Sequence, residues 1–334
     1  MRPGIALLAA VLAAGPAAAR AEEGTRVEKP FPVSKTTILR EEKTVYTVQG
    51  RVRIPRGVSI SCQKDVYIKA REGPAVIEVE GTLELQGVSA REVILEGVTL
   101  EPCERFQELN VDSAIFRKGG GIRTPKGKAC EGKLFVELSH FMTGTTVDVA
   151  LSGGSVDLAS STFLDPVVVR GVDPEGSTGN RVRLVARGCA GGAGNIGFGG
   201  GIVVENVDDV VLQFSRMGGA LTAVRNWGTV FRFDANKVNS GTLEFSHGRA
   251  GKLPKATVVK CDIYSQRVVA KAPADAAVKD VLVLERCWFR GETDPKVLTS
   301  KIVTDGAGDA ANGARIAFGK INDRPLELAG AVDR

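Results

Sequence analysis

One short phrase recurs along most of this chain and constrains its fold more than any other feature. Each copy follows a run of alternating apolar residues and consists of a small polar residue or Cys, any residue, and a large apolar residue. Copies occur at 113–115, 139–141, 161–163, 215–217, 236–238, 261–263 and 287–289, with a degenerate copy from Gly188 ending at Cys189. Their last residues lie roughly 26, 22, 26, 28, 21, 25 and 26 positions apart. Repeats of this length are typical of solenoids, in which each repeat stacks only on its neighbours.

The segments between the phrases have the composition of strands. Residues 76–85 alternate apolar positions (Val79, Leu83, Leu85) with Glu80 and Glu84, which is the pattern of a half-buried strand. No later stretch shows a capped 3.6-residue period, so helical-repeat solenoids are excluded. Parallel crossovers are almost always right-handed. We therefore predict an all-β fold, a single-domain right-handed parallel β-helix (solenoid).

The amino-terminal residues have the pattern of an export signal. Arg2 precedes an apolar run over 5–14, and Ala19-Arg20-Ala21 offers small residues at a cleavage site. The run is too short to span a bilayer, and no other stretch approaches about 20 apolar residues. We expect a signal peptide at 1–21 and a secreted or periplasmic protein without a transmembrane segment. An N-terminal linker is then expected at 22–39, the β-helix at 40–293 and a C-terminal cap or tail with some extended structure at 294–334.

The charge distribution argues against nucleic acid as a partner. Removal of the signal peptide leaves 42 of the 44 basic residues against 39 acidic ones, and nucleic-acid binding calls for clustered cations interleaved with aromatic residues. The pair Lys126 and Lys128 is interpreted as a solvated loop. With two His residues and no Cys-x-x-Cys pattern, no metal site is predicted.

The opening coils carry a resemblance to a known family. Residues 44–58, 79–83 and 93–98 resemble the entry coils of right-handed parallel β-helix proteins of the pectin-lyase-like superfamily. The resemblance extends over roughly 40–290 and implies the fold. It is weak for function, because the superfamily includes lyases, hydrolases, epimerases, adhesins and exported proteins without known activity.

The catalytic signatures that the resemblance implies are incomplete in this chain. A pectate-lyase string begins at Arg53-Ile54-Pro55, but Val58 stands where its second Arg should be. Galacturonan hydrolases pair carboxylates for acid–base attack. Of their four motifs, one is matched by Asp208-Asp209 and a second in part by His247-Gly248, where Ser246 replaces the first Gly. The other two motifs are absent. The epimerase-like pair Asp165-Pro166 is followed by Val167, which stands where the epimerases have their catalytic His. No catalytic residues are assigned and no cofactor is expected. If the protein were a lyase of this superfamily, the resemblance would imply a bound calcium ion.

The phrase itself suggests a surface. If its first residue points inward and its third fills the core, the middle residue points outward, once per turn: His140, Thr162, Gly188, Arg216, Lys237, Asp262 and Trp288. The last four form a line of two cations, a carboxylate and an indole, which would bind an acidic glycan by charge and stacking. The alternative is a solvated face with a weak Lys237–Asp262 pair.

Six cysteines in an exported chain allow disulfides. Cys103 and Cys130 lie about one turn apart beside turn-forming residues, and we predict a bridge between them. Cys261 and Cys287 share one phrase position, which fits either a bridge or a stacked column of buried thiols. Cys62 and Cys189 have no evident partners.

Together these observations predict an exported β-helix of no identifiable catalytic site. It would bind an extracellular or envelope polysaccharide, or a protein partner, through one flank. The alternative is a divergent polysaccharide lyase or glycoside hydrolase that acts on acidic glycans.

Overall fold

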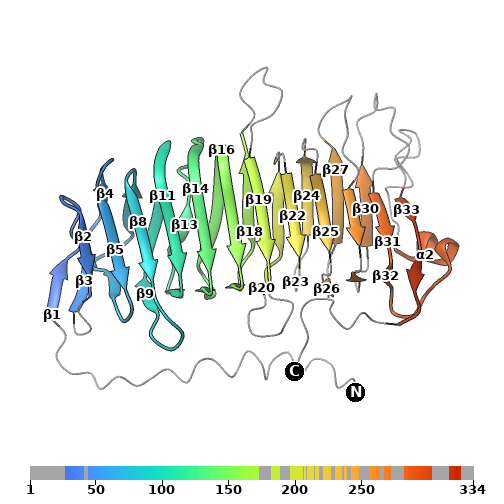
Figure 1. The fold of residues 1–334 in the computed structure, drawn as a ribbon, viewed down its shortest axis with the longest axis horizontal. Coiled ribbons are helices and arrows are strands. Elements are labelled where there is room, and N and C mark those ends of the chain that lie inside the picture. The colour runs from blue at the N-terminus through green and yellow to red at the C-terminus, as the bar shows by residue number, and fades with distance from the viewer. Residues whose placement is uncertain are drawn as a thin grey trace.

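The computed structural model is an elongated parallel β-helix, with strands stacked side by side along its long axis from β1 to β33 (Figure 1). It describes residues 27–40, 44–172, 182–188, 196–205, 207, 209–213, 215–217, 221–226, 230–234, 237–238, 242–247, 256–259, 261–263, 267–271, 282–302 and 316–324. The predicted signal peptide at 1–21 lies outside these residues. The predicted fold class, a single-domain right-handed parallel β-helix, is confirmed.

The strands form three parallel ladders. Ladder A is a 13-stranded sheet: β1 (Val27–Pro30), β3 (Thr44–Val48), β6 (Tyr67–Ala70), β9 (Val93–Glu96), β12 (Ala114–Arg117), β15 (His140–Phe141), β17 (Thr162–Phe163), β20 (Ile196–Phe198), β23 (Ser215–Met217), β26 (Lys237–Val238), β29 (Asp262–Ile263), β32 (Cys287–Trp288) and β34 (Ile321–Asn322). Each strand pairs with the next one in this order.

Ladders B and C together make a 21-stranded sheet, because the long strand β16 (Thr146–Ala159) pairs in both. Ladder B also contains β2 (Thr37–Leu39), β5 (Ser59–Gln63), β8 (Thr82–Gln86), β11 (Arg105–Asp112), β14 (Cys130–Glu137), β19 (Val182–Arg187), β22 (Asp209–Gln213), β25 (Val230–Asp234), β28 (Ala256–Val259), β31 (Leu282–Glu285) and β33 (Ile316–Phe318). Ladder C contains β4 (Arg51–Ile54), β7 (Ala75–Val79), β10 (Val98–Pro102), β13 (Gly121–Arg123), β18 (Val167–Gly171), β21 (Ile202–Glu205), β24 (Leu221–Asn226), β27 (Thr242–His247) and β30 (Arg267–Lys271).

The core is built from the alternation that the sequence shows. In β7 and β8 the residues Ile77, Val79, Leu83 and Leu85 are fully buried, and the Glu residues between them lie on the outer face. On ladder A the rings of Phe116, Phe141, Phe163 and Phe198 stack, with successive centroids 4.4, 4.9 and 5.4 Å apart. This inward stack fixes the register of one turn on the next.

A sharp bend connects ladder B to ladder A. The residue just before the ladder A segment has a positive φ in several turns, at Asp65, Ser113, Leu138, Ser160 and Arg286. Such left-handed conformations are uncommon outside Gly, and here they occur where the chain turns from one ladder to the next. The bend lets a strand end on one face and a new one begin on the next almost at once.

The structure corrects two copies of the phrase. In the register of ladder A, Ala114 rather than Ser113 takes the first position, because Ile115 pairs with His140 and Phe116 with Phe141. Gly188 is not a middle residue either: its N–H bonds to Gln213 at the end of ladder B, and Gly197 holds that position opposite Thr162. Both errors arose because small residues also occur at the bend.

Both ends of the β-helix extend beyond the predicted boundaries. β1 pairs with β3 and β2 with β5, so residues 27–39 belong to the solenoid rather than to a linker. At the other end, β33 and β34 continue ladders B and A. The helix α2 (Pro295–Ile302) lies between β32 and β33 along the chain and is capped by Asp294, whose Oδ1 accepts from Lys296 N at 2.8 Å. Leu298 of α2 is buried against the core.

Candidate functional site: the outer face of ladder A

One row of residues runs along ladder A on its outer face, from β6 to β32. We call it the central row: Tyr67, Ile94, Ile115, His140, Thr162, Gly197, Arg216, Lys237, Asp262 and Trp288, each paired with the next across neighbouring strands. Wherever burial is described in this row, the residue is half-exposed. Its members follow one another at the strand spacing of about 4.8 Å.

The positions that flank the central row point inward. Ser139, Ser161, Cys261 and Cys287, which begin their phrases, are all fully buried. The third residues Phe141, Phe163, Ile263 and Phe289 are buried as well. For these copies, the predicted division into inward first and third residues is confirmed, and described middle residues lie on the outer face.

The predicted binding flank occupies adjacent steps of the central row. Arg216 pairs with Lys237, Lys237 with Asp262, and Asp262 with Trp288, on β23, β26, β29 and β32. The side chains of the first three lie outside what the structure describes. Trp288 is half-buried, and its backbone N donates to Cys261 O at 2.9 Å. The stacking of these four positions is therefore present, and their binding role stays a prediction.

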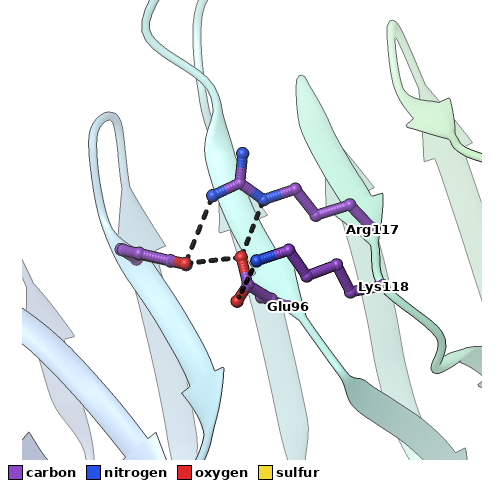
Figure 2. A network of polar contacts seen from close by, with 4 residues as sticks. Glu96, Arg117 and Lys118 are labelled. Atoms are coloured by element: carbon purple, nitrogen blue, oxygen red, sulfur yellow. Dashed lines mark hydrogen bonds and ion pairs between the residues drawn. The ribbon is translucent and has the colours of Figure 1, made fainter. Parts of the chain in front are cut away.

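A compact polar cluster lies at the amino-terminal end of the same face. We call it the Glu96 cluster: Tyr67, Glu96, Arg117 and Lys118, from the ladder A strands β6, β9 and β12 and the residue after β12 (Figure 2). Glu96 is 8 % exposed. Its Oε2 accepts from Tyr67 Oη at 2.7 Å and from Arg117 Nε at 3.0 Å. Its Oε1 accepts from Lys118 Nζ at 3.0 Å.

Further contacts tie Arg117 to Tyr67. Arg117 Nη2 donates to the Tyr67 hydroxyl at 3.2 Å, and the guanidinium carbon lies 5.5 Å from the centroid of the Tyr67 ring. This arrangement adds a cation–π contact to the hydrogen bonds. Three of the four side chains thus bond to one another in a closed triangle, which fixes the guanidinium on the outer face.

The cluster shifts the titration of its own groups. Burial alone would raise the pKa of Glu96, but hydrogen bonds from Tyr67 and Lys118 and the charges of Arg117 and Lys118 outweigh it and lower the pKa. Burial, followed by the hydrogen bond to Glu96, raises the pKa of Tyr67. At neutral pH the cluster therefore holds an ionised carboxylate, a neutral phenol and two cations.

The sequence did not single out the Glu96 cluster, because its members are far apart along the chain. Tyr67 and Glu96 are separated by 29 positions, and Glu96 and Arg117 by 21. A signal was nevertheless present. Glu96 and Arg117 occupy equivalent places in successive turns, each one residue beyond a buried apolar residue, Leu95 and Phe116. Aligning the turns on that residue would have paired them.

The fragments of catalytic motifs serve structural contacts where they are described. Arg53 Nη2 forms an ion pair with Glu80 at 2.9 Å, and Asp165 Oδ2 accepts from Gly144 N at 2.5 Å. Asp208 and Gly248 lie outside the described residues, and for Ser246 and His247 only the backbone, on β27, is described. Lys126 and Lys128 are exposed, as expected of a solvated loop.

Five cysteines are described, and none of them forms a disulfide in the structure: Cys62, Cys103, Cys130, Cys261 and Cys287. Burial raises the pKa of Cys130 to about 12, with a smaller contribution from neighbouring Cys103. The two thiols are not bonded to each other in the structure, and their bridge stays a prediction. Cys261 and Cys287 are buried in successive turns without a bond between them, as in the stacked column. Cys189 lies outside the described residues.

Two further findings concern the described part of the chain. No group of three or more His, Cys, Asp or Glu residues is arranged there to hold a metal ion. None of its helices is long and apolar enough to cross a membrane. Comparison of the chain with protein-family models, with curated proteins and with solved structures finds no match.

Proposed function

We propose that this protein is exported and binds an acidic polysaccharide of the extracellular space or cell envelope along the outer face of ladder A. The observation that carries the proposal is the register of the central row. It places Arg216, Lys237 and Trp288, with Asp262 between the last two, on four consecutive strands. A straight array of this kind runs parallel to the axis of the solenoid, as a linear polymer would.

The chemistry of the four positions suits an anionic sugar chain. Two adjacent cations attract carboxylate or sulfate groups, and an indole offers an apolar face for a sugar ring. Asp262 can accept hydrogen bonds from sugar hydroxyls. Export of the protein is supported by the pattern at 1–21. The resemblance to pectin-lyase-like proteins is likewise part of this proposal.

The test is a binding assay with matched polymers. The purified protein would be titrated calorimetrically with polygalacturonate, with alginate and with neutral dextran, over a range of salt concentrations. We expect binding to the two acidic polymers only. The double variant Arg216→Ala/Lys237→Ala should bind more weakly and with a flatter salt dependence, because exposed charges are screened beyond about 8 Å at physiological salt.

Two further variants make the assay specific. Trp288→Ala should weaken binding at every salt concentration, since ring stacking is not ionic. Lys126→Ala/Lys128→Ala removes the same charge from an exposed loop outside ladder A and should leave binding unchanged. Absence of binding to every acidic polymer would refute the proposal. Release of unsaturated products during the titration would instead favour the lyase alternative.

A further inference from the structure

The Glu96 cluster carries more positive charge than its own contacts use. Glu96 supplies one negative charge to the two cations Arg117 and Lys118. A third cation, Lys69, lies opposite Glu96 on β6, and it forms no ion pair with any residue that the structure describes. The local balance is therefore three cations around one buried carboxylate.

Several donors of this group remain open toward solvent. Arg117 uses Nε and Nη2 in the cluster, and its Nη1 makes no hydrogen bond to a residue that the structure describes. The side chain of Lys118 is 70 % exposed, so an ammonium that donates one hydrogen bond to Glu96 still offers two more protons. These donors face the same side of the protein as the central row, to which Tyr67 belongs.

The backbone beside the cluster is held in an unusual conformation. Lys118, Gly119, Gly120 and Gly121 have consecutive positive φ angles of 55°, 88°, 85° and 121°. Three of these residues are Gly, which adopts such angles readily, but Lys118 does so against a steric cost. A Cβ on Gly120 would lie 2.1 Å from Val98 O, so a side chain there would clash with the neighbouring turn. The Lys118 side chain extends from this bend.

We propose that Lys69, Arg117 and Lys118 form a subsite for an oxyanion, held in place by Glu96 and Tyr67. The oxyanion is a carboxylate or sulfate substituent of the polysaccharide, and this assignment rests on the proposed function. Glu96 and Tyr67 are positioning residues, because they orient Arg117 and would not touch the ligand. The site lies at the amino-terminal end of the central row, several turns from Arg216, so it would bind a separate part of the same polymer.

The subsite is tested with small ions first, independently of any polymer. Sodium sulfate and sodium glucuronate would be titrated into the isotopically labelled protein, and the amide resonances of 117–121 followed by NMR. We expect saturable shifts confined to this corner. The ion concentration at half-saturation should rise about fivefold in Lys69→Ala/Lys118→Ala, because each exposed ion pair changes the binding constant by only a small factor. Lys118→Arg should retain the wild-type midpoint more closely.

The control and the polymer titration separate the two proposals. Lys126→Ala/Lys128→Ala should leave the midpoint unchanged. If the small ions shift the corner but no acidic polymer binds, the subsite stands and the proposed function fails. If polymer binding depends on Arg216 and Lys237 but not on Lys69 and Lys118, and the ions cause no saturable shift, the subsite is overturned. A response to sulfate but not to glucuronate would identify a sulfate ester as the group bound.

Discussion

Glu96 and Arg117 lie directly opposite each other on the adjacent strands β9 and β12, with Arg117 Nε 3.0 Å from Glu96 Oε2. The carboxylate is almost completely buried, whereas the side chain of Arg117 is 41 % exposed. The pair therefore joins a buried anion to a cation that water still reaches. Its contribution to stability depends on the charge of Glu96.

Glu96→Gln should lower the free energy of unfolding by about 1–2 kcal/mol at neutral pH. Hydrogen bonds to a charged acceptor contribute more than neutral ones, but two of the donors are exposed and can return to water. Urea denaturation measures the difference. Glu72→Gln, at an exposed position, is the matched control and should change stability by less than about 0.5 kcal/mol.

The advantage of the wild-type protein over Glu96→Gln should depend on pH. Because the folded-state pKa of Glu96 is lowered from its ordinary value of 4.5, the unfolded chain binds a proton first as the pH falls. The stabilisation is thus fully present above pH 4.5 and is lost as the pH falls through the lowered folded-state pKa. Denaturation of both proteins between pH 7 and pH 3 tests this. A constant difference over that range would contradict it.

Phe141→Ala should destabilise the protein by about 3–5 kcal/mol, because it removes a buried ring and leaves a cavity. Phe141 stacks between Phe116 and Phe163, so the substitution interrupts contact between three turns. Thermal and urea denaturation provide the measurement. The neighbouring Met142→Ala, at a side chain that is 42 % exposed, should have little effect. Equal losses for the two variants would show that the stack does not bear on stability.

Gly120→Ala should cost more than about 2 kcal/mol, since it combines a left-handed backbone with a steric clash. The new Cβ would lie 2.1 Å from Val98 O. Gly57→Ala separates the two causes: Gly57 also has a positive φ, of 82°, but nothing lies within 4 Å of its added Cβ. We expect about 1 kcal/mol there from the conformation alone. Comparison of the two unfolding free energies gives the steric part.

Cys103 and Cys130 should become linked when the protein is exposed to oxidised glutathione, which would accept the two electrons of the thiol pair. Burial raises the pKa of both thiols, and for Cys103 the nearby Glu78 adds to the effect. Linkage should therefore be slow at neutral pH and faster at higher pH, because the thiolate is the reactive form. Mass mapping of unreduced peptides detects it. Fully buried Cys62 is the internal control and should stay unlinked. Recovery of Cys103 and Cys130 as unlinked thiols would reject the bridge.

The carboxyl-terminal part shows what local patterns can indicate and what they leave open. The short helix α2 was not predicted, because eight residues are too few to establish a helical period. Its start signals were nonetheless present, with Asp294 at the cap and Pro295 at the first helical position. The extended structure expected in this region is present in β33 and β34.

The solenoid itself was determined by the sequence, because alternation and turn length are local properties that every turn repeats. Only the tertiary structure decided how the turns align. Ser113 at the bend and Ala114 at the first inward position both have small side chains, so the pattern alone does not tell the two positions apart. The stacking of Phe116 on Phe141 decides which residue begins the inward phrase. The Glu96 cluster likewise required residues 21 and 29 positions apart to meet. The length of each turn varies, and packing of one core layer on the next sets which side chains become neighbours.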